Sequence, residues 1–223
     1  MECTGITIEN KIIVAGIGPG NPDYMVPMAY QAIRKAAVLV GGRRALAQFA
    51  APAGSGQHTM AVTRDIDGVL AFIREELEWH DVVVMVSGDP GYYSLLDALR
   101  RAFPVKRIAV IPGISSMQLA FARLALPWHD ARLVSFHGRQ PQTEEIRYRQ
   151  GAVIGMLTDT AFTSRTIPPL LMEAGWPASA KLHICTRLSY ADERINTITL
   201  GQAAEYSEAV SGILVVSDNF NDT

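Results

Sequence analysis

The chain has 223 residues, of which 48% are hydrophobic, enough to bury the core of one large domain or of two small ones. Its 20 basic and 22 acidic residues nearly cancel, and no window gathers the Lys and Arg residues with which proteins follow nucleic-acid phosphates. Composition and charge therefore argue against a disordered chain and disfavour a nucleic-acid partner.

Neither a leader nor a metal motif is visible in the sequence. Residues 1–10 lack a charged start followed by an apolar stretch, so we expect no secretion signal. No stretch approaches the roughly 18 uninterrupted apolar residues of a membrane span, so we expect no membrane contact. Cys3 and Cys185 lie far apart, and neither has a second cysteine or histidine at metal-ligand spacing. We expect a cytoplasmic protein with reduced thiols and no protein-bound metal.

Strand-like and helix-like stretches alternate along the first half of the chain. The short apolar runs rich in β-branched residues are 11–16, 37–41, 82–87 and 107–111. The stretches whose apolar residues return every three or four positions are 23–35, 65–79, 92–102 and 114–124. This alternation predicts a mostly parallel sheet with helical crossovers.

A second set of elements follows in the rest of the chain. Its strand-like runs are 131–136, 152–157, 181–186, 195–200 and 212–217, with helix-like stretches at 143–150 and 164–173. Residues 126–130 contain Pro127 and are the expected boundary, which divides the chain into domains 1–126 and 127–223. We predict an α/β fold of two small α/β domains, with mostly parallel or mixed sheets and a cleft between the domains.

Residues 16–20, Gly-Ile-Gly-Pro-Gly, form a glycine-rich loop after the first predicted strand. A dinucleotide fingerprint needs a third glycine where Asn21 stands, and Pro19 lacks the backbone N–H that a phosphate cradle uses. A redox nucleotide is therefore the poorer interpretation. A tight strand-to-helix turn without a ligand is equally compatible with these residues.

Two further loops follow predicted strands. Residues 87–93 read Ser-Gly-Asp-Pro-Gly-Tyr-Tyr, and residues 111–116 read Ile-Pro-Gly-Ile-Ser-Ser. Ligands of open α/β sheets bind beyond the carboxyl ends of the strands, where both loops are expected. The first loop could instead be only a turn, and the serines of the second could only cap a helix. The residues alone leave these alternatives open.

The order and spacing of the three loops resemble the tetrapyrrole methylase family. The match continues through residues 135–139, 157–159 and 187–194, and so covers nearly the whole chain. Residues 122–128 and 137–139 resemble the branch that methylates carbon 5 of a ring-contracted corrin precursor on the route to vitamin B12. The resemblance implies an S-adenosylmethionine-dependent C-methyltransferase acting on precorrin-7 or cobalt-precorrin-7. It also implies a homodimer, because members of the family form one.

The resemblance further assigns residues to the methyl-donor site. Pro19 is expected to line it, Gly88, Asp89 and Tyr92 to hold the polar groups of S-adenosylmethionine, Ser115 and Ser116 to contact it through hydroxyls or backbone, and Leu157 and Leu188 to offer backbone to the adenine. In fused relatives a second unit handles carbon 15 and decarboxylation, so a separate protein with that activity is an expected partner.

Three side chains are candidates for handling the tetrapyrrole. His137 could act as a general base, although a lone histidine beside a glycine is more often a structural hydrogen-bonding group. Arg139 and Arg43 could pair with acetate and propionate arms, since a guanidinium matches a carboxylate in two-pronged geometry. A solvated surface is the alternative for Arg43, and an ion pair with Glu144 or Glu145 is the alternative for Arg139.

Two other functions compete with this interpretation. One is another methyltransferase of the same superfamily, which modifies RNA ribose or a modified histidine; near-neutral charge and residues 137–139 argue against these versions. The other is a non-catalytic module that binds a nucleotide or a tetrapyrrole. Turnover of a labelled methyl donor with a corrin precursor separates an enzyme from such a module.

Overall fold

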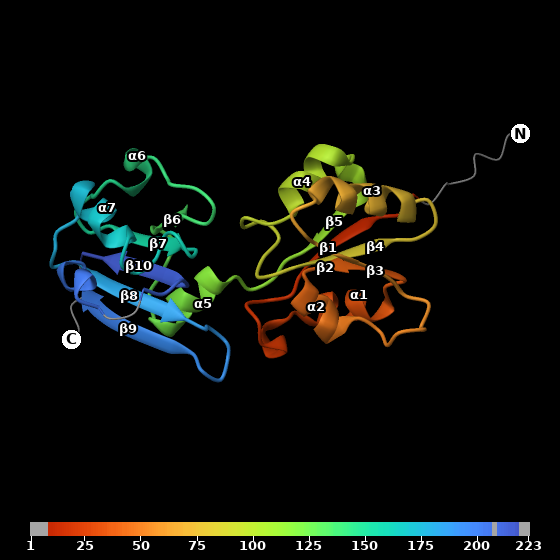
Figure 1. Ribbon diagram of the computed structural model, residues 1–223, viewed down its shortest axis with the longest axis horizontal. Helices are drawn as coiled ribbons and strands as arrows, with labels where there is room; N and C mark the ends of the chain where they lie inside the picture. The colour runs from red at the N-terminus through yellow and green to blue at the C-terminus, as the bar shows by residue number, and fades with distance from the viewer. Residues whose placement is uncertain (1–8, 207–208, 219–223) are drawn as a thin grey trace, which may run out of the picture. The chain divides into compact units, whose positions relative to one another are not determined.

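A computed structural model describes residues 9–206 and 209–218 of the chain. The chain forms two compact units, Met1–Ser115 and Ser116–Thr223, and each is described by itself (Figure 1). Each unit contains one five-stranded sheet with helices, which confirms the predicted α/β fold. None of the helices within the described residues is long and apolar enough to cross a membrane.

The first unit contains a fully parallel sheet in the order β3-β2-β4-β1-β5. Its strands are β1 (Ile12–Gly16), β2 (Val38–Gly41), β3 (His58–Ala61), β4 (Val82–Val86) and β5 (Ile108–Ile111). Every residue of the central β4 is buried, as expected for a parallel strand that is covered on both faces. Because all five strands run the same way, their carboxyl ends lie at one edge of the sheet.

Helices cover both faces of this sheet, with α1 and α2 on one side and α3 and α4 on the other (Figure 1). Their bounds are α1 (Pro27–Lys35), α2 (Arg43–Phe49), α3 (Ile66–Glu76) and α4 (Leu96–Ala102), with short 3-10 turns η1 (Pro22–Tyr24) and η2 (Val105–Arg107). Ile33 packs with Leu39 and Met85 in one buried cluster, and Ile73 packs with Val84 in the other.

The sequence analysis was wrong about some boundaries of the first unit. It missed α2 and β3, which are short and carry several exposed polar residues. The helix expected over residues 92–102 begins only at Leu96, because Tyr93 has a φ of 51° that no right-handed helix accommodates. The helix expected over 23–35 is divided into η1 and α1.

The second unit contains a mixed sheet in the order β6-β7-β10-β8-β9. Its strands are β6 (Arg132–Ser135), β7 (Val153–Leu157), β8 (Lys181–Thr186), β9 (Arg194–Thr199) and β10 (Ile213–Ser217). Only β6 and β7 pair in parallel, and the other neighbours are antiparallel. Ile213, the first residue of β10, lies opposite both Leu157 and Cys185, so the carboxyl ends of β7 and β8 flank the start of β10.

Helices also cover the second sheet. They are α5 (Ser116–Arg123), α6 (Thr143–Ile146) and α7 (Ile167–Glu173), with the 3-10 turn η3 (Gly201–Ala204). Helix α5, which the sequence analysis placed in the first domain, packs on this sheet: a Cβ at Gly155 of β7 would lie 2.6 Å from Sδ of Met117. The helix expected over 143–150 ends early because Arg147 is extended, with a ψ of 135°.

Candidate active site

The three glycine-containing loops of the first unit meet at the carboxyl edge of its sheet. They follow β1, β4 and β5, as the sequence predicted. The backbone N–H of Gly88 donates to the carbonyl of Gly18 at 2.8 Å, and the two residues form an antiparallel bridge. The first two loops are therefore joined through their backbones.

The backbones of the loops lie so close together that side chains do not fit between them. A Cβ on Gly16 would lie 2.7 Å from the carbonyl oxygen of Gly88, and a Cβ on Gly113 only 2.3 Å from the same atom. Gly88 itself has a φ of 69°, a conformation that side chains disfavour. Here glycine serves the close approach of three backbones, in addition to any approach of a ligand.

Asp89 joins the second loop to the third. One carboxylate oxygen accepts from the backbone N–H of Gly91 at 2.8 Å, and the other accepts from that of Gly113 at 3.0 Å. The sequence analysis expected this side chain to hold polar groups of the methyl donor. The carboxylate keeps free lone pairs for that purpose, but its contacts within the unit serve to position the loops.

Tyr92 follows Asp89 and contains a buried polar atom. Its hydroxyl has no hydrogen-bond partner among the described residues, and burial raises the pKa of the phenol well above its usual value. The hydroxyl is therefore a neutral donor, and leaving it unpaired costs about 1–3 kcal/mol. An acceptor on a bound ligand would remove this cost.

The other donor-site residues expected at this edge of the sheet lie in these loops or directly after them. Pro19 is half-buried in the turn between Gly18 and Gly20. Ser115 is buried, and its Cα would lie 3.3 Å from a Cβ on Gly88. Ser116 begins α5 and so belongs to the second unit. The structure thus brings Pro19, Gly88, Asp89 and Ser115 to one sheet edge.

A cavity of about 270 Å³ lies beside the first loop, and sequence reasoning did not foresee it. Its polar lining comes from the loops after β1 and β4 and from α2, namely Gly18, Gly20, Ser87, Arg43, Arg44 and Gln48. Arg43 is exposed, and within the described residues its guanidinium forms no ion pair or hydrogen bond. The cavity therefore offers a cationic group next to the expected donor loop.

The candidate residues of the second unit also gather at one sheet edge. Ser135 lies opposite Leu157 in the parallel pair of β6 and β7, so His137 emerges beside the end of β7. Leu188 follows the end of β8. The start of β10 pairs with the end of β7 on one side and with the end of β8 on the other. The strand register alone therefore places His137, Leu157 and Leu188 at the same edge.

The backbone around Leu188 is strained in a way that the sequence does not signal. Its neighbours Arg187 and Ser189 have positive φ values of 54° and 72°, which residues other than glycine rarely adopt. Glu193 holds this loop, because its carboxylate accepts from the Ser189 N–H at 2.7 Å and from Arg123 at 2.6 Å. The Arg123 hydrogen bond lowers the pKa of Glu193. Strain of this kind is often retained where a backbone must contact a ligand.

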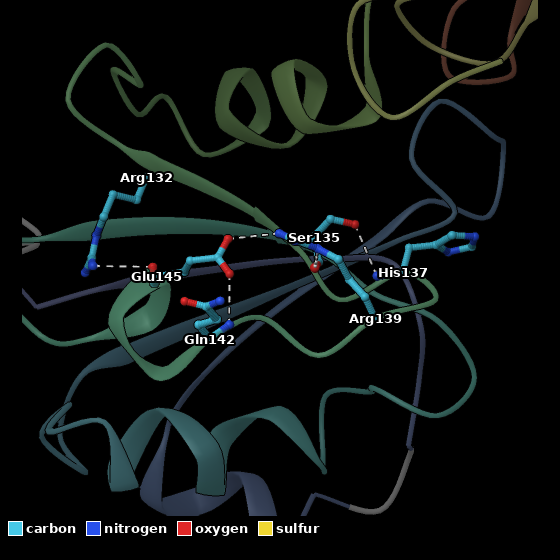
Figure 2. A network of polar contacts seen from close by, with 6 residues as sticks. All are labelled: Arg132, Ser135, His137, Arg139, Gln142 and Glu145. Atoms are coloured by element: carbon cyan, nitrogen blue, oxygen red, sulfur yellow. Dashed lines mark hydrogen bonds and ion pairs between the residues drawn. The ribbon is translucent and has the colours of Figure 1, made fainter. Parts of the chain in front are cut away.

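His137 is exposed at the end of β6, and its backbone is held in place. Its N–H donates to Oγ of Ser135 at 3.2 Å, and its Nδ1 lies 3.4 Å from the carbonyl oxygen of Thr158. Figure 2 shows the imidazole pointing away from the neighbouring polar network. Within the described residues no group of three or more His, Cys, Asp or Glu side chains is placed to hold a metal ion.

Arg139 is bound within its own segment. Its Nε donates to the carbonyl of Ser135 at 3.2 Å, and its Nη2 donates to Glu145 at 2.9 Å (Figure 2). The other oxygen of Glu145 accepts from the N–H of Gln142 at 2.8 Å, and this bond, followed by Arg139, lowers the pKa of Glu145. The ion pair with Glu145, which was the alternative for Arg139, is therefore the geometry found. For Arg139 to bind a substrate carboxylate, this pair would have to break.

The chain is similar in sequence to known proteins. The family model of the tetrapyrrole (corrin/porphyrin) methylases matches residues 11–204. Cobalt-precorrin-7 C(5)-methyltransferase of Salmonella typhimurium is 32% identical over 83% of this chain and 89% of its own length. Precorrin-6Y C(5,15)-methyltransferase (decarboxylating) of a Sinorhizobium species is 30% identical over 83% of this chain, but the match spans only 44% of that longer enzyme.

Among solved structures, the uroporphyrin-III C-methyltransferase of Thermus thermophilus in complex with S-adenosyl homocysteine resembles the chain with a TM-score of 0.71. The match covers 94% of this chain and 92% of that protein at 21% identity. At this identity the likeness shows a shared fold.

Proposed function

We propose a specific reaction for this chain, which belongs to the family of tetrapyrrole (corrin/porphyrin) methylases. It is an S-adenosylmethionine-dependent methyltransferase that acts on carbon 5 of precorrin-7 or cobalt-precorrin-7 in cobalamin biosynthesis. The observation that carries the proposal is the 32% identity to a cobalt-precorrin-7 C(5)-methyltransferase, which extends over 83% of the chain. The loops of the first unit and the edge of the second provide groups that suit this reaction.

The loops fit S-adenosylmethionine in two respects. The glycines carry no side chains that could cover the loop backbones, although the N–H groups of Gly88 and Gly113 are bound within the unit. The buried hydroxyl of Tyr92 lacks an acceptor among the described residues. When bound, the donor supplies an electrophilic methyl group to a nucleophilic ring carbon and keeps the electron pair of the broken bond on sulfur. We propose Pro19, Gly88, Asp89, Tyr92, Ser115 and Ser116 as donor-site residues of these loops. Backbone groups of Leu157 and Leu188 add contacts to the adenine.

The chain needs no covalent nucleophile for this chemistry, because holding the reactants in line supplies up to roughly 7–11 kcal/mol. The methylated ring system must lose a proton to balance the new bond. We propose that His137 accepts this proton at Nε2. Its Nδ1 lies 3.4 Å from the carbonyl oxygen of Thr158, which only accepts hydrogen bonds, so this contact favours the tautomer with the hydrogen on Nδ1 and the lone pair on Nε2.

The two candidate arginines take different roles in this proposal. Arg43 lines the cavity beside the donor loop and has no partner among the described residues, so it supports recognition of an acetate or propionate arm. Arg139 is paired with Glu145 and is proposed to hold the segment from which His137 projects. Its expected action as a substrate clamp stays a prediction.

Three further statements about the protein are proposals from the family resemblance. The chain acts as a cytoplasmic homodimer, for which light scattering at micromolar concentration shows about twice the chain mass of 24.3 kDa. A clean monomer contradicts the dimer. The name of the Sinorhizobium relative joins methylation at carbons 5 and 15 with decarboxylation, which supports a functional partner for the carbon-15 and decarboxylation steps.

Methyl transfer with purified chain tests the proposal. Labelled S-adenosylmethionine is incubated with corrin precursors of different ring state, with and without cobalt, and the transfer of label to the tetrapyrrole is measured. A methyltransferase turns over many donors for each chain. A binding module leaves the donor intact while it binds S-adenosylhomocysteine or the corrin.

A further inference from the structure

We infer that Asp159 is a positioning residue for His137. Asp159 holds the loop of residues 137–139, here called the histidine loop, on a rigid edge of the second sheet and so directs Nε2 of His137 to the reacting ring. The inference rests on the proposed role of His137 as the base. Asp159 belongs to residues 157–159, one of the segments that resemble the family, and the resemblance assigns it no role.

The two carboxylate oxygens of Asp159 have different partners. Oδ1 accepts from the backbone N–H groups of Ala161 and Phe162, both at 2.8 Å, and closes the turn that follows β7. Oδ2 accepts from the N–H of Gly138 at 2.8 Å, in the loop that follows β6. These bonds, that from Gly138 first, lower the pKa of Asp159, so the carboxylate is charged at neutral pH. One oxygen thus shapes its own turn, and the other holds the histidine loop.

The backbone that carries Asp159 is itself fixed to the sheet. Oγ1 of Thr158 donates to the carbonyl of Gly212 at 2.9 Å and accepts from the N–H of Gly212 at 2.6 Å. Thr158 is buried, and Gly212 directly precedes β10. The backbone of Thr158 and Asp159 is therefore connected to the central strand of the sheet.

Bonds of His137 and Arg139 to Ser135 and of Arg139 to Glu145 also hold the histidine loop, but they lie within residues 135–145. Gly138 is exposed, has a φ of 70°, and a Cβ built on it would meet no atom within 4 Å. The hydrogen bond to Asp159 therefore connects the loop directly to the turn that follows β7. The same arrangement places the carbonyl of Thr158 against Nδ1 of His137. Two adjacent residues directly after β7, Thr158 and Asp159, thus contact the histidine loop, one at the imidazole and the other at the backbone of Gly138.

Asp159→Asn separates the two functions of this carboxylate. An asparagine keeps one acceptor oxygen for Ala161 and Phe162 and turns an NH₂ group toward the N–H of Gly138, so only the bond to the histidine loop is lost. We expect kcat to fall about 10- to 100-fold, as for a displacement of about 1 Å of a catalytic group. The KM values for donor and corrin should change by less than about twofold, because neither binding surface is altered.

Asp65→Asn is the matched control. Asp65 also accepts a hydrogen bond from a glycine N–H, that of Gly68 at 2.9 Å, but at the start of α3 in the first unit. Asparagine caps a helix as well as aspartate does, so this variant loses the same charge without an effect on kcat. His137→Gln provides the reference for loss of the base and should lose about 100- to 10,000-fold in kcat.

Two measurements besides activity report the positioning directly. In the wild-type protein, ¹⁵N NMR should show the imidazole of His137 with its hydrogen on Nδ1, and the amide of Gly138 should exchange slowly for an exposed glycine. In Asp159→Asn the tautomer preference should weaken and the Gly138 amide should exchange faster. The wild-type exchange rate decides the matter even if the variant does not fold, because a Gly138 amide that exchanges like a free peptide contradicts the inference.

The outcomes separate this inference from the proposed function. If His137→Gln is inactive while Asp159→Asn retains full kcat and the same imidazole tautomer, Asp159 does not position the base. If His137→Gln retains full activity, the base role of His137 itself is wrong, whatever Asp159→Asn does. Loss of activity in both variants, with unchanged Asp65→Asn, is the expected result.

Discussion

Nη2 of Arg139 lies 2.9 Å from Oε1 of Glu145, so the arginine that directly follows the His137–Gly138 loop is joined to the short helix α6. Glu145 also completes a capping box with Gln142 at the start of that helix. This ion pair therefore connects the end of β6 to α6.

The carboxylate of Glu145, bound first by the N–H of Gln142 and then by Arg139, should contribute to stability in a pH-dependent way. The pKa of Glu145 is lowered from its usual 4.5, so its contribution is present above pH 4.5 and is lost as the pH falls through the lowered value. We expect Glu145→Gln to lower Tm at pH 7, by a small amount because the pair is partly exposed, and to match wild type in stronger acid. Thermal unfolding across pH measures this.

Glu144→Gln serves as the control for that comparison. Glu144 pairs with Arg147 at 2.9 Å, and both side chains are about 60% exposed, so this substitution should shift Tm less. Equal Tm values for wild type and Glu145→Gln at pH 7 contradict the assigned scaffold role.

Gly88→Leu tests the donor loop. A side chain at Gly88 would approach Ser115 and cover the backbone that the donor is proposed to contact, so the affinity for S-adenosylhomocysteine should fall. Gly54→Leu is a matched control, because Gly54 also has a positive φ, 86°, but has open space around it. Calorimetry on both variants separates backbone strain from loss of the site. Unchanged affinity in Gly88→Leu rejects the assignment.

Arg43→Lys tests the cavity beside the donor loop. Lysine keeps the charge but loses the two-pronged geometry, so kcat/KM for the corrin should fall about 10- to 100-fold, the equivalent of about 1.5–3 kcal/mol. The affinity for S-adenosylhomocysteine should stay the same. Arg34→Lys, in a separate cavity beside α1, is the control. A corrin kcat/KM that is equal in wild type and Arg43→Lys removes Arg43 from the substrate site.

Cys185 should be inert in the folded protein. Its thiol is buried, and burial raises its pKa to about 12, so almost no reactive thiolate exists at pH 8. Alkylation at pH 8 followed by peptide mapping should leave Cys185 unmodified until the chain is unfolded, and the mapping distinguishes it from Cys3. Modification of Cys185 in the native protein at the rate of a free thiol contradicts this burial.

Sequence patterns predicted most of the strands, and the most uniformly buried strand gave the plainest signal. Residues 82–87 read as a strand because β4 is apolar throughout and buried on both faces. The edge strand β3 was missed because its first two residues, His58 and Thr59, are exposed and give no apolar pattern. Helix α2 was missed because it has only seven residues and a single buried one, Ala45.

The candidate site shows the same division between local and long-range information. Motif spacing located Asp89 and Gly138, but their partners depend on tertiary structure: Gly113 lies 24 residues from Asp89, and Asp159 lies 21 residues from Gly138. Arg139 differs, because its partner Glu145 lies only 6 residues away and was one of the two acids expected for it. The positive φ values of Arg187 and Ser189 have no signature in residue type. The sequence could therefore name residues near the site, and the nearby acid that binds Arg139, but not the partners that lie far along the chain.

The most direct test of the account is the position of the transferred methyl group. The purified chain is incubated with S-adenosylmethionine labelled with ¹³C in its methyl group and with precorrin-7 or its cobalt form, and the product is examined by ¹³C NMR. The account predicts one labelled methyl group per corrin, attached to carbon 5, and a much slower reaction with His137→Gln. A label at another ring carbon, or no transfer to either form of the corrin by a chain that binds S-adenosylhomocysteine, contradicts it.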